Sequence, residues 1–276
     1  MSISGTTKLI AHLGYPTESF KAPLIYNPYF AARSIDAVVV PMGCKSEEFA
    51  QFLSGLTRLS NFLGGLITMP HKVAVVDLLD EASTTVKVAG SCNAIRVNAD
   101  GGTTGDMFDG EGFVRGVERK GRTLKGARVL VIGCGGVGSA IAASLAKSGV
   151  GQLGIREIKS PVKTALAKRL ALHFPHLSLS LDAASDDTWD VIVNATPLGM
   201  NPGDPLPIDL ADVPSSTLVG EVVLSNKITP FLHHARQRGC DIQVGLDMLF
   251  EQIPAYLEFF DLPTSTPDEL RATALL

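Results

Sequence analysis

The chain has 276 residues, including 27 glycines and 16 prolines, and apolar residues make up 45% of it. This length suits one large or two modest domains, and the apolar fraction is enough for a packed core, which excludes a mainly disordered chain. The formal net charge of −4 argues against a general nucleic-acid binder, because phosphate binding requires a basic surface.

The same composition limits the remaining partners. Four scattered cysteines without C-x-x-C spacing indicate neither a disulfide framework nor a zinc site, so we expect no metal. No stretch approaches the ~18 continuous apolar residues that a membrane span requires, and the N-terminal residues lack the pattern of a signal peptide. We therefore expect a cytoplasmic protein with a small-molecule substrate and neither a membrane nor a nucleic-acid partner.

The first 107 residues alternate short apolar runs with helical patterns. Residues 9–13 and 37–40 are short, apolar and bounded by glycine and proline, which predicts strands with a helix between them. Ser46 is the predicted N-cap of a further helix, whose expected buried face consists of Phe49, Phe52, Leu53 and Leu56. The order strand, helix, strand, helix predicts a parallel-rich α/β layer.

A second unit begins near Gly126. Residues 128–132 are a continuous apolar run of the kind buried in parallel sheets, and a glycine loop and a helix of small residues follow at once. One later helix carries Val162, Leu166 and Leu170 on one face, and others start after Thr229 and Thr266. Further strands are expected at 153–155, 177–181, 190–195, 218–223 and 241–244. We expect two α/β domains with a cleft between them.

The glycine loop is the first motif that carries chemistry. Residues 133–138 match G-x-G-x-x-G directly after a buried strand and at the start of a helix. The missing side chains let the backbone approach a pyrophosphate, and the helix N-terminus supplies N–H donors. A tight turn without a ligand is the alternative interpretation. The residues assigned to a dinucleotide here are Gly133, Gly135, Gly136, Val137 and Gly138.

The choice between NAD and NADP depends on the residue that ends the next strand. An acidic residue about 20 positions after the loop binds the adenosine ribose in such folds, and Glu157 is the candidate. Its carboxylate would accept a hydrogen bond from the 2′-OH of NAD and repel the 2′-phosphate of NADP. Arg156 and Lys159 beside it could instead pair with that phosphate. The sequence favours NAD and leaves NADP open.

Four further motifs join the glycine loop. They are T-M-P-H-K at 68–72, just past a predicted strand and at a helix start, D-M-F-D-G at 106–110, N-A-T-P-L-G-M at 194–200 and G-L-D-M-L-F-E-Q at 245–252. Together they resemble the shikimate/quinate dehydrogenase family over nearly the whole chain. The resemblance implies an α/β substrate domain at 1–107, a Rossmann dinucleotide-binding domain at 108–244, and C-terminal helices at 245–276 that return to the first domain.

The resemblance also implies an activity. It is reversible hydride transfer between NAD(P) and a ring hydroxyl or ketone of a cyclic polyhydroxy acid, in aromatic amino acid biosynthesis or in quinate and shikimate metabolism. It leaves the oligomeric state open between monomer and homodimer. The residues that it adds to the cofactor site are Asn194, Thr196, Pro197, Met200, Val222, Gly245 and Met248.

Two residues match the family's catalytic pair, Lys72 and Asp109. As hydride leaves a carbinol carbon, the hydroxyl proton must pass to a positioned base, and the reverse reaction needs an acid. Taken alone, Lys72 would be an exposed helix lysine and Asp109 a helix N-cap. The resemblance assigns contacts with ring hydroxyls to Thr68, Asn93 and Gln252, which by themselves fit local turn or cap positions equally well.

The chain departs from the family where the substrate carboxylate binds. Family members read approximately G-x-P-I-x-H-S-x-S-P, and both serines bind that carboxylate. An alignment without gaps places Phe20 and Ala22 at the serine positions, while Leu66 replaces an asparagine and Leu224 a tyrosine. Each hydrogen bond lost to a charged group costs about 1.5–3 kcal/mol. We expect a cyclic polyol or hydroxy-ketone with an altered, neutral or repositioned acid group, and expect shikimate and quinate to be poor substrates.

Two alternatives stay open at this point. The chain could be a working shikimate dehydrogenase with a re-formed pocket, which is the nearest named activity. It could also be a catalytically weak dinucleotide or metabolite sensor of the same fold. Lys72 and Asp109 count against a sensor, because a protein without turnover does not need a proton relay.

Overall fold

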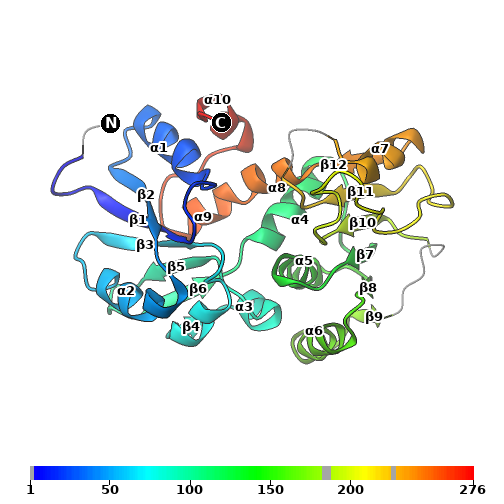
Figure 1. Ribbon diagram of the computed structural model, residues 1–276, viewed down its shortest axis with the longest axis horizontal. Coiled ribbons are helices and arrows are strands. Elements are labelled where there is room, and N and C mark those ends of the chain that lie inside the picture. Colours follow the sequence, from blue (N-terminus) through cyan, green and yellow to red (C-terminus); the bar gives the residue numbers. More distant parts are fainter. Residues whose placement is uncertain (1–2, 182–187, 225–227) are drawn as a thin grey trace. The chain divides into compact units, whose positions relative to one another are not determined.

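The computed structural model describes residues 3–181, 188–224 and 228–276. These residues form two compact units. Unit 1 runs up to Phe108 and resumes at Ile253–Leu276, and unit 2 is Asp109–Gln252. Figure 1 shows a sheet with flanking helices in each unit.

Unit 1 is built on a six-stranded mixed sheet with the order β2-β1-β3-β5-β6-β4. Its strands are β1 (Lys8–Gly14), β2 (Ala37–Gly43), β3 (Phe62–Ile67), β4 (Glu81–Ala82), β5 (Ala94–Val97) and β6 (Thr103–Asp106). The central strand β1 pairs in parallel with both β2 and β3, which confirms the predicted parallel-rich layer. Strand β5 is antiparallel to both β3 and β6, and the sequence analysis did not anticipate this hairpin.

The helices of unit 1 cover both faces of this sheet. They are α1 (Ala22–Ala32), α2 (Phe49–Leu56), α3 (Thr84–Ala89), α9 (Ile253–Phe259) and α10 (Pro267–Thr273), with short 3₁₀ turns η1 (Ser46–Glu48) and η2 (Ala74–Leu78). Figure 1 shows α1 and α10 on one side of the sheet and α2 on the other. The predicted start of α10 is confirmed, because Thr266 and Glu269 form a reciprocal capping box.

Two expectations for α2 are wrong. Ser46 does not cap α2: it opens η1, and α2 starts only after Glu48. Phe52, expected on the buried face, is 38% exposed. The helix has only eight residues, and its buried face is made by Phe49, Leu53 and Leu56 alone.

Unit 2 is built on a six-stranded sheet in which every pair of neighbours is parallel. Its strands are β7 (Arg128–Ile132), β8 (Gln152–Arg156), β9 (Ser178–Ser180), β10 (Val191–Asn194), β11 (Leu218–Glu221) and β12 (Asp241–Gln243). The spatial order β12-β11-β10-β7-β8-β9 is that of a doubly wound Rossmann sheet. The chain changes direction between β7 and β10, and ligands bind at such a switch point in open α/β sheets.

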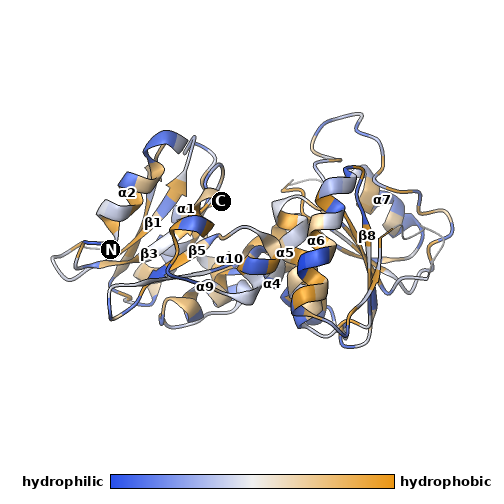
Figure 2. Ribbon diagram, turned by 90° about the horizontal axis from the view of Figure 1, so that it is seen from below, coloured by the Kyte–Doolittle hydropathy of each residue, from blue (hydrophilic) through white to orange (hydrophobic). Residues whose placement is uncertain are grey.

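Four helices of unit 2 were predicted from the sequence, and α4 was not. The helices of this unit are α4 (Asp109–Arg119), α5 (Gly136–Lys147), α6 (Ser160–His173), α7 (Pro230–Gln237) and α8 (Gly245–Glu251). Thr229 caps α7 as expected. On α6, Leu166 and Leu170 are buried but Val162 is 39% exposed, because it lies in the first turn, and Figure 2 shows hydrophobic and hydrophilic bands along this helix.

Helix α8 belongs to unit 2, and the chain returns to unit 1 after Gln252. The reason is that α8 packs on α4 of unit 2: a Cβ added to Gly112 would lie 2.7 Å from the Cβ of Gln252. Among the described residues, no helix is long and apolar enough to cross a membrane.

Candidate active site

The glycine loop joins β7 to α5 at the switch point of the unit 2 sheet. Gly133 has a φ of +96°, which favours glycine, and a Cβ there would lie 2.8 Å from Cγ2 of Thr196. A Cβ at Gly138 would collide with the carbonyl oxygen of Gly133. Gly135 and Gly136 are exposed, and the N-cap Gly135 offers no side chain to the first turn of α5. The loop therefore presents open backbone N–H groups, which fits a pyrophosphate.

Glu157 follows β8 and is tied to the glycine loop. Its carboxylate accepts hydrogen bonds from the backbone N–H of Cys134 at 2.8 Å and of Lys159 at 2.9 Å. Burial alone would raise the pKa of Glu157, but these backbone hydrogen bonds outweigh it and lower the pKa below its ordinary value. The carboxylate is thus ionised and fixed beside the loop, and Arg156 next to it is exposed.

The segment 194–200 forms a tight turn after β10. Asn194 is fully buried: its Oδ1 accepts hydrogen bonds from the backbone N–H and the hydroxyl of Thr196, and its amide donates to Leu198 O at 2.9 Å. Its side chain therefore organises the turn. Pro197 and Met200 are exposed on the same turn.

Three other residues of the expected cofactor site follow later strands of the sheet. Val222 follows β11 directly, and Gly245 opens α8. A Cβ at Gly245 would lie 2.8 Å from the carbonyl carbon of Val222, so the two backbones touch. Met248 is buried one turn further along α8.

In unit 1, Lys72 lies in the turn that follows β3. The turn is held by His71, which is buried, stacks on Phe49 with ring centroids 4.0 Å apart, and contacts Cys44 O through Nε2 at 2.8 Å. The carbonyl of Lys72 accepts a hydrogen bond from the N–H of Cys92 at 2.8 Å. Lys72 is half-buried and precedes the 3₁₀ turn η2, where a helix start was expected.

Three of the four substituted positions, Phe20, Ala22 and Leu66, lie in unit 1 with this turn. A Cβ at Gly14 would lie 2.8 Å from the tip of the Phe20 ring and would also collide with the Thr68 side chain, so Phe20 and Thr68 flank the end of β1. Ala22 is the first residue of α1. Leu66 on β3 is buried, and Leu224, in unit 2, is 53% exposed.

The structure adds one residue to this group, His12. It pairs in register with Leu66, and its ring stacks on Phe20 with centroids 4.0 Å apart. Burial, and then the charge of Lys72, lower the pKa of His12 to about 4. The sequence analysis missed it. The available signal was a single titratable side chain in the apolar run L-I-A-H-L, at the end of a predicted strand.

Three more expected residues are buried, one in unit 1 and two in unit 2. In unit 1, Asn93 is buried and its Oδ1 accepts a hydrogen bond from the N–H of Phe108 at 2.8 Å. In unit 2, Asp109 is the first residue of α4 and is buried. Gln252 is buried against Gly112, one turn after Asp109, and its Oε1 has no hydrogen-bond partner among the described residues.

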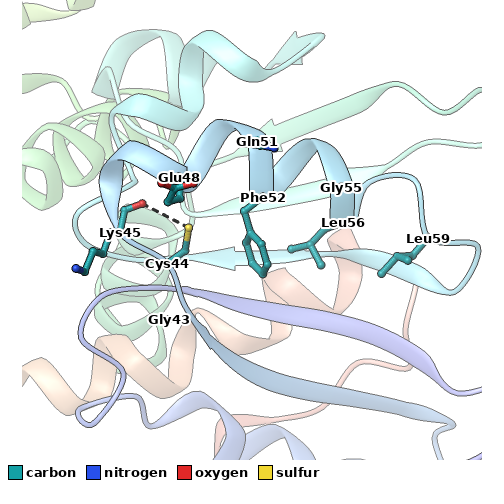
Figure 3. A pocket seen from close by; sticks show the side chains of 9 residues that line it. All are labelled: Gly43, Cys44, Lys45, Glu48, Gln51, Phe52, Gly55, Leu56 and Leu59. Atoms are coloured by element: carbon teal, nitrogen blue, oxygen red, sulfur yellow. Dashed lines mark hydrogen bonds between the residues drawn. The ribbon is translucent and has the colours of Figure 1, made fainter.

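A separate groove of about 700 Å³ lies between α2 and the end of β2 in unit 1. Figure 3 shows Phe52 and Leu56 extending from α2 over it. None of the expected site residues lines this groove. Within the described ranges, no group of three or more His, Cys, Asp or Glu residues is arranged to hold a metal ion.

Comparison with known proteins agrees with this arrangement. Residues 13–95 match the family model "Shikimate dehydrogenase substrate binding domain", and residues 113–156, which include the glycine loop, match that of the "ThiF family". A shikimate dehydrogenase (NADP(+)) of Salinibacter ruber is 35% identical over 268 residues, which cover 92% of this chain and 92% of that protein. The chain belongs to the shikimate dehydrogenase family.

Solved structures share the fold of this chain. A quinate dehydrogenase from Corynebacterium glutamicum in complex with NAD has 28% sequence identity and a TM-score of 0.84, covering 97% of this chain and 98% of that one. A ligand-free 5-ketofructose reductase of Gluconobacter sp. strain CHM43 has a TM-score of 0.88 at 23% identity, covering 98% of each chain, a likeness that shows the fold alone.

Membership of the family confirms three expectations. The motif resemblance was correct, and so was the fold class of an α/β substrate domain with a Rossmann domain. The protein is a dehydrogenase that acts on a CH–OH group.

Proposed function

We propose that this protein transfers hydride between a nicotinamide dinucleotide and a ring hydroxyl or ketone of a shikimate-like cyclic polyol, with Lys72 and Asp109 as the catalytic pair. The observation that supports this most is the fixed turn that carries Lys72. It follows the carboxyl end of a central strand, where open α/β sheets bind ligands, and buried His71 anchors it.

The residues of unit 2 fit the cofactor. The open backbone of the glycine loop suits the pyrophosphate, and Glu157 suits an adenosine ribose with a free 2′-OH. When bound, the nicotinamide supplies the hydride acceptor or donor. We propose a preference for NAD, because the ionised Glu157 would repel a 2′-phosphate. The relative from Salinibacter ruber is named for NADP(+), so the cofactor preference is a point on which this chain would differ.

The pair would act on the proton of the reacting oxygen. In the direction of oxidation, the substrate hydroxyl donates a hydrogen bond to one member and loses its proton as hydride departs. In the direction of reduction, the Lys72 ammonium donates a hydrogen bond to the ketone and then its proton. Asp109 would be the other member of the pair that passes the proton on. Thr68, Asn93 and Gln252 would orient the ring hydroxyls, and the buried, unpartnered Oε1 of Gln252 supports its assignment.

The substrate class follows from what surrounds Thr68. Where the family places two serines and an asparagine, this chain has Phe20, Ala22 and Leu66, none of which has a polar side chain. A carboxylate set against them would be desolvated without hydrogen bonds, which costs several kcal/mol. We propose that the preferred substrate is a cyclic polyol or hydroxy-ketone that carries a neutral group in place of the shikimate carboxylate.

Nicotinamide absorbance tests this function. The purified chain is assayed with NAD⁺ and NADP⁺ against shikimate, quinate, the methyl ester of shikimate, and uncharged cyclic polyols. We expect turnover with at least one uncharged polyol, and a loss of turnover of about 10²–10⁴-fold in Lys72→Ala with cofactor affinity retained. Cofactor binding without turnover of any probe would contradict the proposal and favour a sensor.

A further inference from the structure

His12 lies next to two of the substituted positions, Leu66 and Phe20. It is the third residue from the end of β1, in register with Pro41 on β2 and with Leu66 on β3. Side chains at the same register of neighbouring strands point to the same face of the sheet. His12 and Leu66 therefore lie side by side on one face, near the carboxyl ends of their strands.

The ring of Phe20 covers His12 from above the sheet. The two rings stack with centroids 4.0 Å apart and an angle of 27° between their planes. The absence of a side chain at Gly14 lets the Phe20 ring approach this closely, since a Cβ there would lie 2.8 Å from it. Phe20 thus holds the imidazole in one orientation beside Thr68.

The imidazole has a polar atom that the fold does not use. Nδ1 of His12 is buried and has no hydrogen-bond partner among the described residues. Buried polar atoms almost always have a partner, so an exception beside a proposed binding site calls for an explanation, and an oxygen atom of the substrate supplies one. Its neighbours on the sheet and the ring above it are Leu66 and Phe20, which offer neither donor nor acceptor.

The imidazole is also neutral at physiological pH. Burial disfavours its charged form, and the nearby positive charge of Lys72 disfavours it further. A neutral imidazole offers one N–H donor and one acceptor nitrogen, which complements a hydroxyl. It gives a carboxylate no opposite charge.

We propose that His12 determines substrate specificity by forming a hydrogen bond through Nδ1 with an uncharged oxygen of the substrate, at the end of the ring that packs against Phe20 and Leu66. This inference rests on the proposed function. It adds that His12 supplies a hydrogen bond to an uncharged group of the substrate, where the family's hydrogen bonds to the carboxylate are lost. His12 acts in binding, while the proton transfer stays with Lys72 and Asp109.

The test compares two variants and a control. His12→Leu introduces an apolar side chain of similar size that lacks Nδ1. His12→Asn introduces an amide group near the position of Nδ1. His176→Asn, at an exposed position of unit 2, is the matched control. Each is assayed with the methyl ester of shikimate and with shikimate. Binding of both probes is followed separately by the chemical shifts of the histidine ring in the NMR spectrum.

In His12→Leu we expect KM for the ester to rise about tenfold or more, because a buried polar contact to the substrate is lost, with kcat nearly unchanged. His12→Asn should recover part of this loss, and a merely structural role of His12 would not explain such a recovery. In His12→Leu, KM for shikimate should change less than KM for the ester. In the wild type, the ester should shift the His12 resonances.

Three results would overturn the inference. One is a wild type that turns over the ester together with a His12→Leu variant that has the same KM for it. This result would leave the proposed function intact. Another is an equal loss in His12→Asn and His12→Leu. The third is a wild-type protein that neither turns over nor binds any probe, which contradicts the proposed function together with this inference.

Discussion

The carboxylate of Glu157 accepts a hydrogen bond from the backbone N–H of Cys134 at 2.8 Å. This bond joins the residue after β8 to the second residue of the glycine loop. The same carboxylate also accepts from Lys159 N–H. The backbone donors favour the ionised form of this acid, and in the proposed cofactor site its charge would face a 2′-phosphate.

We predict that Glu157→Gln moves the cofactor preference toward NADP. The variant removes the negative charge and one strong acceptor for the ribose, so kcat/KM for NAD⁺ should fall relative to NADP⁺ by about tenfold, as for one charge-assisted hydrogen bond. Steady-state kinetics with both cofactors measures this ratio. Arg156→Gln is the companion variant, and it should not move the ratio toward NADP. A ratio unaltered in Glu157→Gln would show that this acid does not select the cofactor.

We predict that polar residues at the three substituted positions recover affinity for a carboxylate. The triple variant Phe20→Ser, Ala22→Ser, Leu66→Asn should lower KM for shikimate at least tenfold, since each new hydrogen bond to a charged group is worth about 1.5–3 kcal/mol. KM for the uncharged methyl ester should not improve. Ala22→Ser alone is the control for a single hydroxyl at the start of α1. Equal changes for both probes would mean that these positions do not recognise the charge.

We predict that His12 makes stability depend on pH. Its pKa is 6.5 when unfolded and about 4 when folded, so between these values the unfolded chain binds the extra proton. The contribution of neutral His12 is therefore complete above pH 6.5 and is lost as the pH falls toward 4. Between neutral pH and about pH 5 this loss amounts to about 2 kcal/mol.

Urea unfolding of the whole protein at neutral pH and at about pH 5 measures this contribution. It is done for the wild type and for His12→Leu. The wild-type free energy of unfolding should fall more steeply on acidification than that of the variant, which lacks the titrating group. Identical pH dependence in the two proteins would show that His12 is not buried beside Lys72 as described.

The sequence predicts strands best where they are continuous and apolar. The apolar run at 128–132 predicts a buried parallel strand, and the glycine loop after it predicts the start of a helix. Both elements are confirmed. The hairpin of β5 and β6 was missed because its strands are short and T-T-G-D has no apolar alternation. Pairing of β5 with β3 depends on distant residues, which local patterns do not encode.

The candidate site was predicted mainly through motifs. The turn of Lys72 and the replacements at Phe20 and Leu66 are visible in the sequence, but their convergence on His12 is not. That convergence depends on the register of β1 against β3 and on the path of the loop after Gly14. The internal hydrogen bonds of Asn194 depend in the same way on the shape of its turn.

The central claim is that Lys72 and Asp109 act as one unit on the substrate proton. A double-mutant cycle on kcat, with Lys72→Met, Asp109→Asn and the double variant, tests it most directly with whichever polyol the wild type oxidises. We predict that each single variant loses about 10²–10⁴-fold and that the double variant is no slower than the slower single, because residues that act together do not lose activity additively. Losses that multiply in the double variant, or a single variant with wild-type turnover, would contradict the account.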